Sequence, residues 1–152
     1  AASVFDLLEL GFAGSEALKE LQVETDYRFQ KAEFRDGIFA GNDVPMASRH
    51  QAGLRLAARL NNGFGVSLGE RFIGPRYVIN DTSNLMPKEK MYFLTDLKFS
   101  LVKTNWEASL AVNNLFDRMY NDYAAKSTGN STNIEYYPAA GRNFTAGMKV
   151  RF

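Results

Sequence analysis

Residues 105–113 read Asn-Trp-Glu-Ala-Ser-Leu-Ala-Val-Asn, and along this stretch apolar side chains alternate with polar or small ones. The apolar positions are Trp106, Ala108, Leu110 and Val112. Successive side chains of a β-strand point to opposite faces of the sheet, so a period of two predicts an extended strand. The stretch therefore predicts a strand with one apolar face and one wet face.

The same alternation recurs along the rest of the chain. It begins again near Leu21, Ser48, Phe64, Met91 and Phe144, and the last of these runs ends at Phe152. Two polar residues, Glu70 and Thr95, interrupt the apolar faces of their runs. We therefore predict an all-β fold, an antiparallel meander of about seven strands. Each strand would have about 11 to 14 residues, against the 5 or 6 usual in globular sheets.

The connections between these strands alternate in length. Short connections lie at residues 61–63, where Asn-Asn-Gly suits a hairpin turn, and at 103–104. Long polar loops are predicted around residues 36–45, 77–89 and 117–141. Before Leu21 the sequence allows a strand over residues 4–12 followed by a tight turn, or a helical turn capped by Ser15. The first preserves the alternation of long and short connections.

Composition argues against several classes of function. The chain has no cysteine, a single histidine and a net charge of +1. It therefore lacks thiolate chemistry, a histidine-rich metal site and a strong charge attraction for nucleic acid. Oxygen ligands for Ca²⁺ occur at Asp36, Asn42 and Asp43, but their spacing is not that of an EF-hand loop. The sequence favours turn residues there, and His50 is expected at a strand end.

Two further patterns resemble sites but have simpler explanations. The glycines at 63, 65 and 69 have the wrong spacing for a nucleotide loop and open a strand, not a helix. Asp96 and Glu107 lie on neighbouring predicted strands, as a catalytic carboxylate pair would. Because Lys98 shares the face of Asp96, a network of charges is favoured over catalysis. We therefore expect no catalytic residue, no cofactor and no bound metal.

Period-two strands also build soluble sandwiches and lipocalin-like carriers, and these remain alternatives. Three features favour a transmembrane barrel instead: long strands, loops segregated by length, and aromatic residues near strand ends. In such a barrel the apolar faces contact lipid and the charged faces line a wet lumen. A small, complete eight-stranded outer-membrane barrel with an adhesive or structural role is the nearest alternative.

The residues that follow Val112 resemble a family signature. They are similar to the Asn-Leu-Phe-Asp-x-x-Tyr motif near the C-terminus of TonB-dependent outer-membrane receptors, which precedes a long loop, a Gly-Arg pair and a final strand ending in Phe. The matching positions are Asn114, Leu115, Phe116, Asp117, Tyr120, Gly141, Arg142 and Phe152. A weaker pattern of the same family covers residues 41–45 and His50. The resemblance extends over residues 41–152 and is specific over 106–152.

This resemblance implies a 22-stranded barrel closed by an N-terminal plug. Residues 1–152 are then expected to be a C-terminal barrel segment, with the plug and the earlier strands outside it. The implied location is the bacterial outer membrane, and the implied function is energy-coupled uptake of a scarce nutrient such as a ferric siderophore or cobalamin. The implied partners are outer-membrane lipid, the TonB energy-coupling protein through the plug, and the barrel-assembly machinery, with no nucleic acid.

Two sets of residues are candidates for a role in that function. The loop at 117–141 supplies amphipathic rings and cations suited to capturing an organic anion, at Arg118, Tyr120, Tyr123, Lys126, Tyr136 and Tyr137. The last strand carries an apolar stripe that resembles the C-terminal assembly signal of outer-membrane proteins, at Phe144, Met148, Val150 and Phe152. Both assignments are predictions from the sequence.

Overall fold

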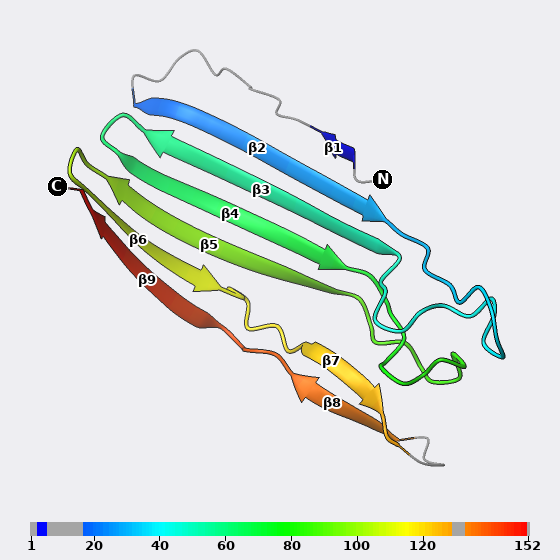
Figure 1. Cartoon of the computed structure of the whole chain (residues 1–152). Coiled ribbons are helices and arrows are strands. Elements are labelled where there is room, and N and C mark those ends of the chain that lie inside the picture. Colours follow the sequence, from blue (N-terminus) through cyan, green and yellow to red (C-terminus); the bar gives the residue numbers. More distant parts are fainter. Residues whose placement is uncertain (1–2, 6–16, 129–132, 152) are drawn as a thin grey trace.

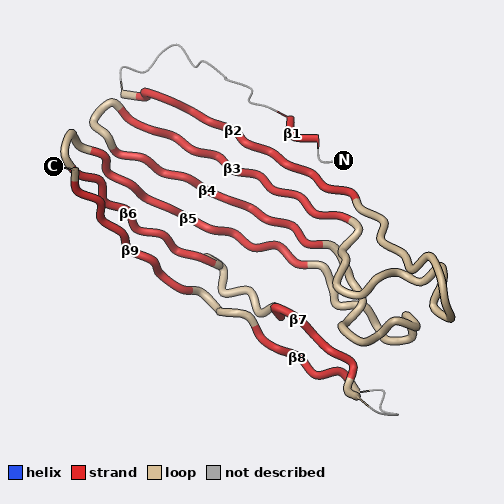
Figure 2. The backbone as a smooth tube through the Cα atoms, in the orientation of Figure 1, coloured by secondary structure: helices blue, strands red, loops and turns tan. Residues whose placement is uncertain are grey.

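A computed structural model describes residues 3–5, 17–128 and 133–151 of the chain. Within these ranges the structure consists of strands, turns and loops, and contains no helix (Figure 2). No helix long and apolar enough to cross a membrane occurs in the described part of the chain. The prediction of an all-β fold is confirmed.

Seven strands form one antiparallel sheet in the order β1-β2-β3-β4-β5-β6-β9, and β7 and β8 form a separate two-stranded hairpin (Figure 1). The strands of the sheet are β1 (Ser3–Phe5), β2 (Leu18–Phe29), β3 (His50–Leu60), β4 (Phe64–Ile73), β5 (Tyr92–Val102), β6 (Trp106–Asn113) and β9 (Asn143–Val150). The hairpin comprises β7 (Asn121–Lys126) and β8 (Ile134–Pro138). Neighbours in the sheet are neighbours in sequence except where the hairpin intervenes, so the predicted meander is confirmed.

The connections are sorted to the two ends of the sheet, as predicted. The turns β3–β4 and β5–β6 lie together at one end, while the long connections lie at the other (Figure 1). Gly63 closes the β3–β4 turn with φ of 89°, and a β-carbon there would collide with the carbonyl oxygen of Val102. Glycine alone satisfies both demands at this position.

The register places the apolar positions of all the long strands on one face. In the middle of the sheet Leu68 pairs with Leu56 and with Leu97, and Val112 pairs with Leu97 and with Phe144. Leucines in the centre of this face keep about 40% of their surface exposed, because no second layer covers them in the described residues. The fully buried apolar side chains Val78 and Ala124 lie instead among the loops and the hairpin.

The two polar interruptions of the apolar face meet each other. Glu70 of β4 and Thr95 of β5 are direct cross-strand partners. The hydroxyl of Thr95 donates a hydrogen bond to Oε2 of Glu70 at 2.5 Å. Each polar group therefore satisfies the other on a face that is mainly apolar.

Several predicted boundaries differ from the structure. β2, β3 and β5 have 11 or 12 residues, within the predicted range, whereas β4, β6 and β9 have 8 to 10 and are shorter than predicted; β2 begins at Leu18 instead of Leu21. Residues 117–141, predicted as one long polar loop, connect β6 to β9 and contain two short strands, β7 and β8, which pair with each other. Of the strand predicted over 4–12, residues 4–5 belong to β1, and 6–12 lie outside the described residues, as does Ser15.

Candidate ligand-binding site

The first two long connections, residues 30–49 and 74–91, pack together beyond the end of the sheet, and we call them the loop body. The described part of the hairpin of β7 and β8 packs against it. The amide of Asn42 donates to the carbonyl of Thr82 at 2.9 Å. The amide of Asn84 donates to the carbonyl of Asp43 at 3.0 Å, and its carbonyl accepts from the backbone N–H of Asp43 at 2.7 Å. These bonds join the first two loops.

A buried carboxylate shapes the β4–β5 loop. Asp81 is fully buried, and its two oxygens accept the backbone N–H groups of Leu85 and Met86, both at 3.0 Å. Asn84 adopts the left-handed conformation, with φ of 56°, inside the turn that this bonding closes. Asparagine tolerates that conformation better than most residues, which suits it to the position.

An ion pair ties the first loop to the start of β3. Arg49 Nη2 lies 2.6 Å from Oδ1 of Asp43, and Lys88 Nζ lies 3.5 Å from Oδ2. The hydrogen bond from Arg49 holds the pKa of Asp43 below its ordinary value, against the opposing effect of partial burial. Asn42 and Asp43 are therefore occupied by protein partners, and not solvated as the turn interpretation implied. Among the described residues no three Asp, Glu or His side chains are grouped for a metal.

The hairpin is attached to this unit by backbone and side-chain bonds. Ile79 and Ala125 form an isolated parallel bridge. Arg76 is mostly buried, its Nε lies 2.9 Å from Glu89, and its Nη2 donates to the carbonyls of Asn121 and Asp122. The guanidinium contacts both Glu89, within the β4–β5 loop, and the first residues of β7, so it fixes where the hairpin leaves the sheet.

The residues of the family signature lie at the base of the hairpin. Asn114 is 5% exposed, with φ of 52°, and its side chain accepts from the N–H of Arg118 at 2.8 Å and donates to the carbonyl of Arg118 at 2.9 Å. Its own N–H donates to Asp96 at 2.8 Å. Asp117 accepts the N–H of Arg142 at 2.7 Å, where β9 is about to begin. These bonds connect β5, the end of β6 and the start of β9.

The remaining signature residues are closely placed around that junction. A β-carbon at Gly141 would lie 2.8 Å from Oδ1 of Asp117, so the absence of a side chain lets the carboxylate reach Arg142. Leu115 donates its N–H to the carbonyl of Thr95 at 2.7 Å. Phe116 points outward and is 76% exposed. The segment is thus a dense backbone cross-link with an exposed aromatic ring beside it.

A hollow of about 340 Å³ opens between the β4–β5 loop, the start of β5 and residues 118–121. Its walls include three cations and three tyrosines: Lys88, Lys90, Arg118, Tyr92, Tyr120 and Tyr136. The rings of Tyr92 and Tyr120 pack with centroids 5.0 Å apart. Aromatic surfaces with convergent cations suit an organic anion.

The hollow brings together half of the residues that the sequence nominated for ligand contact. Arg118, Tyr120 and Tyr136 line it, whereas Tyr123, Tyr137 and Lys126 do not. Sequence reasoning missed Lys88, Lys90 and Tyr92, which come from the preceding connection. Nothing in their local pattern distinguishes them from a solvated loop and a strand end.

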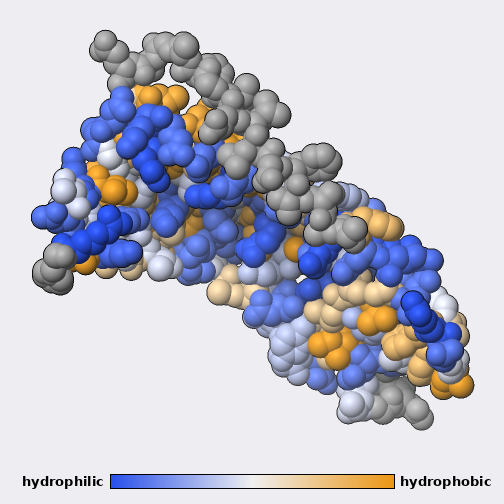
Figure 3. Space-filling view, turned by 45° about the horizontal axis from the view of Figure 1, so that its top comes forward, coloured by the Kyte–Doolittle hydropathy of each residue, from blue (hydrophilic) through white to orange (hydrophobic). Residues whose placement is uncertain are grey.

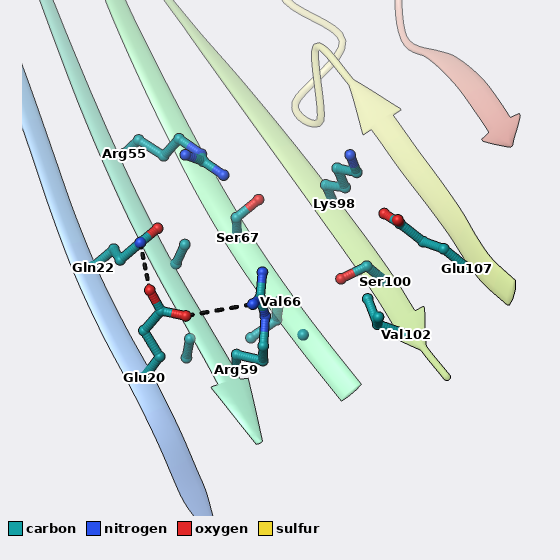
Figure 4. Close-up of a pocket in the computed structure, with 13 residues that line it drawn as sticks. Glu20, Gln22, Arg55, Arg59, Val66, Ser67, Lys98, Ser100, Val102 and Glu107 are labelled. Atoms are coloured by element: carbon teal, nitrogen blue, oxygen red, sulfur yellow. Dashed lines mark hydrogen bonds and ion pairs between the residues drawn. The ribbon is translucent and has the colours of Figure 1, made fainter. Parts of the chain in front are cut away.

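The polar face of the sheet carries a second, smaller hollow of about 140 Å³ near the tight-turn end (Figure 4). Arg59 lies 3.5 Å from Glu20, which also accepts a hydrogen bond from Gln22, and Arg55 lies 2.8 Å from Glu24. In the view of Figure 3, hydrophilic residues cover much of the sheet and hydrophobic residues gather over the loops at the lower right.

The carboxylates considered as a catalytic pair are well separated on this polar face. Glu107 is paired with Val102, six residues along β5 from Asp96, a separation of about 20 Å. Asp96 lies 3.9 Å from Arg71 and accepts from the backbone of Asn114. Its partner is therefore an arginine of β4, and not the Lys98 suggested by the sequence.

The strand nominated as an assembly signal forms one edge of the sheet. β9 pairs with β6 and is exposed along its whole length, with Phe144 68% and Met148 73% exposed. Both residues belong to the apolar face, as does Val150 through its pairing with Trp106. Phe152 lies outside the described residues.

The sheet is an antiparallel meander similar to a fragment of a barrel receptor. The chain is similar to the ferric-catecholate import receptor Fiu of Escherichia coli K12 in its closed form. The two are 25% identical with a TM-score of 0.69, over 87% of this chain and 19% of the receptor. The chain thus spans about a fifth of the length of that receptor. No protein-family model and no curated protein matches the sequence.

Proposed function

We propose that this chain is a wall segment of a TonB-dependent outer-membrane receptor that imports a ferric siderophore. The observation that carries the proposal is the similarity to a ferric-catecholate import receptor along nearly the whole chain. The signature at residues 114–120 supports the same family. Under this proposal the chain performs transport and makes or breaks no covalent bond.

The dimensions of the apolar face support a position in a membrane. Phe64 and Phe72 mark the two ends of this face on β4, and each contacts a phenylalanine of β5. They are eight residues apart, which is about 26 Å along the strand. At the ~40° tilt of strands in outer-membrane barrels this spans about 20 Å along the membrane normal, within the ~25 Å apolar band. Rings at both margins with Val66 and Leu68 between them suit such a band, and the polar residue of this stretch, Glu70, is hydrogen-bonded to Thr95.

The open edges of the sheet support a larger barrel. Each strand edge presents unpaired N–H and C=O groups, and in lipid each such group costs several kcal/mol. β9 and β1 have one partner each in the described structure. The proposed barrel supplies the missing partners from strands outside residues 1–152, together with a plug that contacts the TonB protein.

The charge and shape of the 340 Å³ hollow support an organic anion as ligand. Lys88, Lys90 and Arg118 line it together with three tyrosines. A ferric catecholate is large, aromatic and negatively charged, so it matches both features, and cobalamin lacks the negative charge. We therefore place ferric siderophores ahead of cobalamin.

The test uses the full-length protein in its own outer membrane. Cells that lack the gene should lose uptake of radioactive ferric catecholate, and the wild-type gene should restore it. K90Q and R118Q should each weaken binding about two- to fivefold, the range for one partly exposed charge. K103Q, at the tight-turn end, makes the same change of charge and should leave binding unchanged.

The outcomes separate the parts of this proposal. Gene-dependent uptake of cobalamin, with no uptake of the ferric catecholate, would show that the proposed substrate is wrong. Unaltered uptake of both compounds after gene deletion would refute the receptor function. Uptake that depends on the gene but ignores K90Q and R118Q would move the ligand site away from this hollow.

A further inference from the structure

The β7–β8 hairpin has two faces with different surroundings. On one face Ala124 and Ile134 pack against Val78 and Met86 of the loop body. Lys126 is the direct partner of Ile134, so its side chain belongs to the same face. The opposite face carries Tyr123, its partner Tyr137, and Glu135 two residues before it.

The outward face holds a small aromatic platform beside a carboxylate. The rings of Tyr123 and Tyr137 stack with centroids 4.2 Å apart and 18° between their planes. They keep 39% and 41% of their surface exposed. The hydroxyl of Tyr137 lies 3.5 Å from Oε2 of Glu135. The negative charge of Glu135 raises the pKa of Tyr137, as expected where the local potential is negative.

The loop body already uses the same combination to hold a cation. Lys88 Nζ lies 4.4 Å from the centre of the Tyr77 ring and 3.5 Å from the carboxylate of Asp43. A tyrosine face attracts the cation through its quadrupole, and the carboxylate adds a direct charge contact. That place is filled by a lysine of the chain itself.

We propose that Tyr123, Tyr137 and Glu135 form a binding site for an ammonium or guanidinium group from another molecule. The platform repeats the pairing of tyrosine and carboxylate seen at Lys88. Lys126, the cation of β7, lies on the other face of the hairpin and does not fill it. The site is separate from the 340 Å³ hollow, whose cations select the opposite charge, and it does not depend on the identity of the imported ligand.

The experiment measures binding of a blocked, fluorescein-labelled tetra-arginine peptide to the full-length protein in detergent at low salt. The comparison peptide is tetra-citrulline, which has nearly the shape of arginine and no charge. E135Q removes the carboxylate charge and Y137L removes a ring. The matched controls are D36N, an exposed acid in the β2–β3 loop, and Y27L, an exposed tyrosine near the end of β2.

The expected result is a loss of affinity of about threefold for each of E135Q and Y137L, the scale of one exposed ion pair or cation–π contact. D36N and Y27L should bind the arginine peptide as the wild type does. Tetra-citrulline should bind about tenfold more weakly, because it lacks the charge that both contacts need.

Equal binding of the citrulline and arginine peptides would overturn the proposal, since a platform that stacks neutral groups or sugar rings makes no use of charge. Equal losses of peptide affinity in D36N and E135Q would also overturn it, because the net charge of the protein would then explain the binding without a specific site. Spermidine distinguishes the sources of the cation. Displacement of the labelled peptide by spermidine assigns the site to small amines as well as arginine side chains, and its failure restricts the site to guanidinium-bearing peptides.

Discussion

Replacement of Asn114 should loosen the base of the hairpin by an amount that follows from its contacts. Its side chain makes two short hydrogen bonds with the backbone of Arg118, at 2.8 and 2.9 Å, in a site that is 5% exposed. Each is worth about 1 kcal/mol. The left-handed conformation costs an alanine roughly another 1 kcal/mol. Asn114→Ala should therefore cost about 3 kcal/mol.

Asn114→Gly separates the two causes. Glycine adopts the left-handed conformation without strain but makes neither side-chain bond, so its cost should be about 2 kcal/mol. The backbone N–H of Arg118 reports the event directly, because Asn114 is its acceptor. Hydrogen exchange of peptides that cover residues 114–120 should accelerate about 100-fold in the alanine variant and about 30-fold in the glycine variant.

The order of the two variants is the decisive observation. If glycine exchanged faster than alanine, backbone strain would not contribute and the cost would lie elsewhere. Unchanged protection of Arg118 in both variants would refute the role of this side chain altogether. Exchange in β3 and β4 is the internal control, since these strands make no bond to Asn114 and should keep their protection.

Two further predictions concern the apolar face and the loop body. Thr95→Val should destabilise the sheet by about 1–3 kcal/mol in reversible unfolding from lipid vesicles, because it leaves Glu70 without its partner. The double variant Thr95→Val with Glu70→Leu should be close to neutral. Equal losses of stability in the single and double variants would contradict the pairing. Arg49 lowers the pKa of Asp43 from 3.8 in the folded state. The carboxylate therefore stabilises the loop fully above about pH 4, and this stabilisation is lost as the pH falls through the lowered pKa. Proteolysis of residues 30–49 should increase toward acid pH in the wild type, and Asp43→Asn should be sensitive to proteolysis at all these pH values.

The sheet was predictable from the sequence because local patterns of residues specify it. A period of two places Leu54, Leu56 and Leu68 on one face whatever the rest of the chain does, and Asn-Asn-Gly encodes a turn by itself. The alternation of long and short connections then fixed which end of the sheet each loop occupies.

The loop body was not predictable in the same way, because its bonds are long-range. Asn84 binds the backbone of Asp43, 41 residues earlier, and Asp81 is buried by a turn that it organises itself. β7 and β8 are short and polar, and the apolar residues Ala124 and Ile134 gain their packing only from the β4–β5 loop. Such contacts depend on where distant segments meet, which period and composition do not encode.

The hydrogen bond between Glu70 and Thr95 has a consequence for how the strands find their places. A slip of one residue between β4 and β5 would place polar side chains of one strand on the apolar face of the sheet, and the alternation alone penalises it. A slip of two residues keeps every apolar residue on the apolar face and avoids that penalty. It would, however, set Glu70 opposite Phe93 or Leu97, with a stranded carboxyl group in an apolar environment. The pairing of Glu70 with Thr95 therefore disfavours the two-residue slip, which the hydrophobic pattern alone does not exclude.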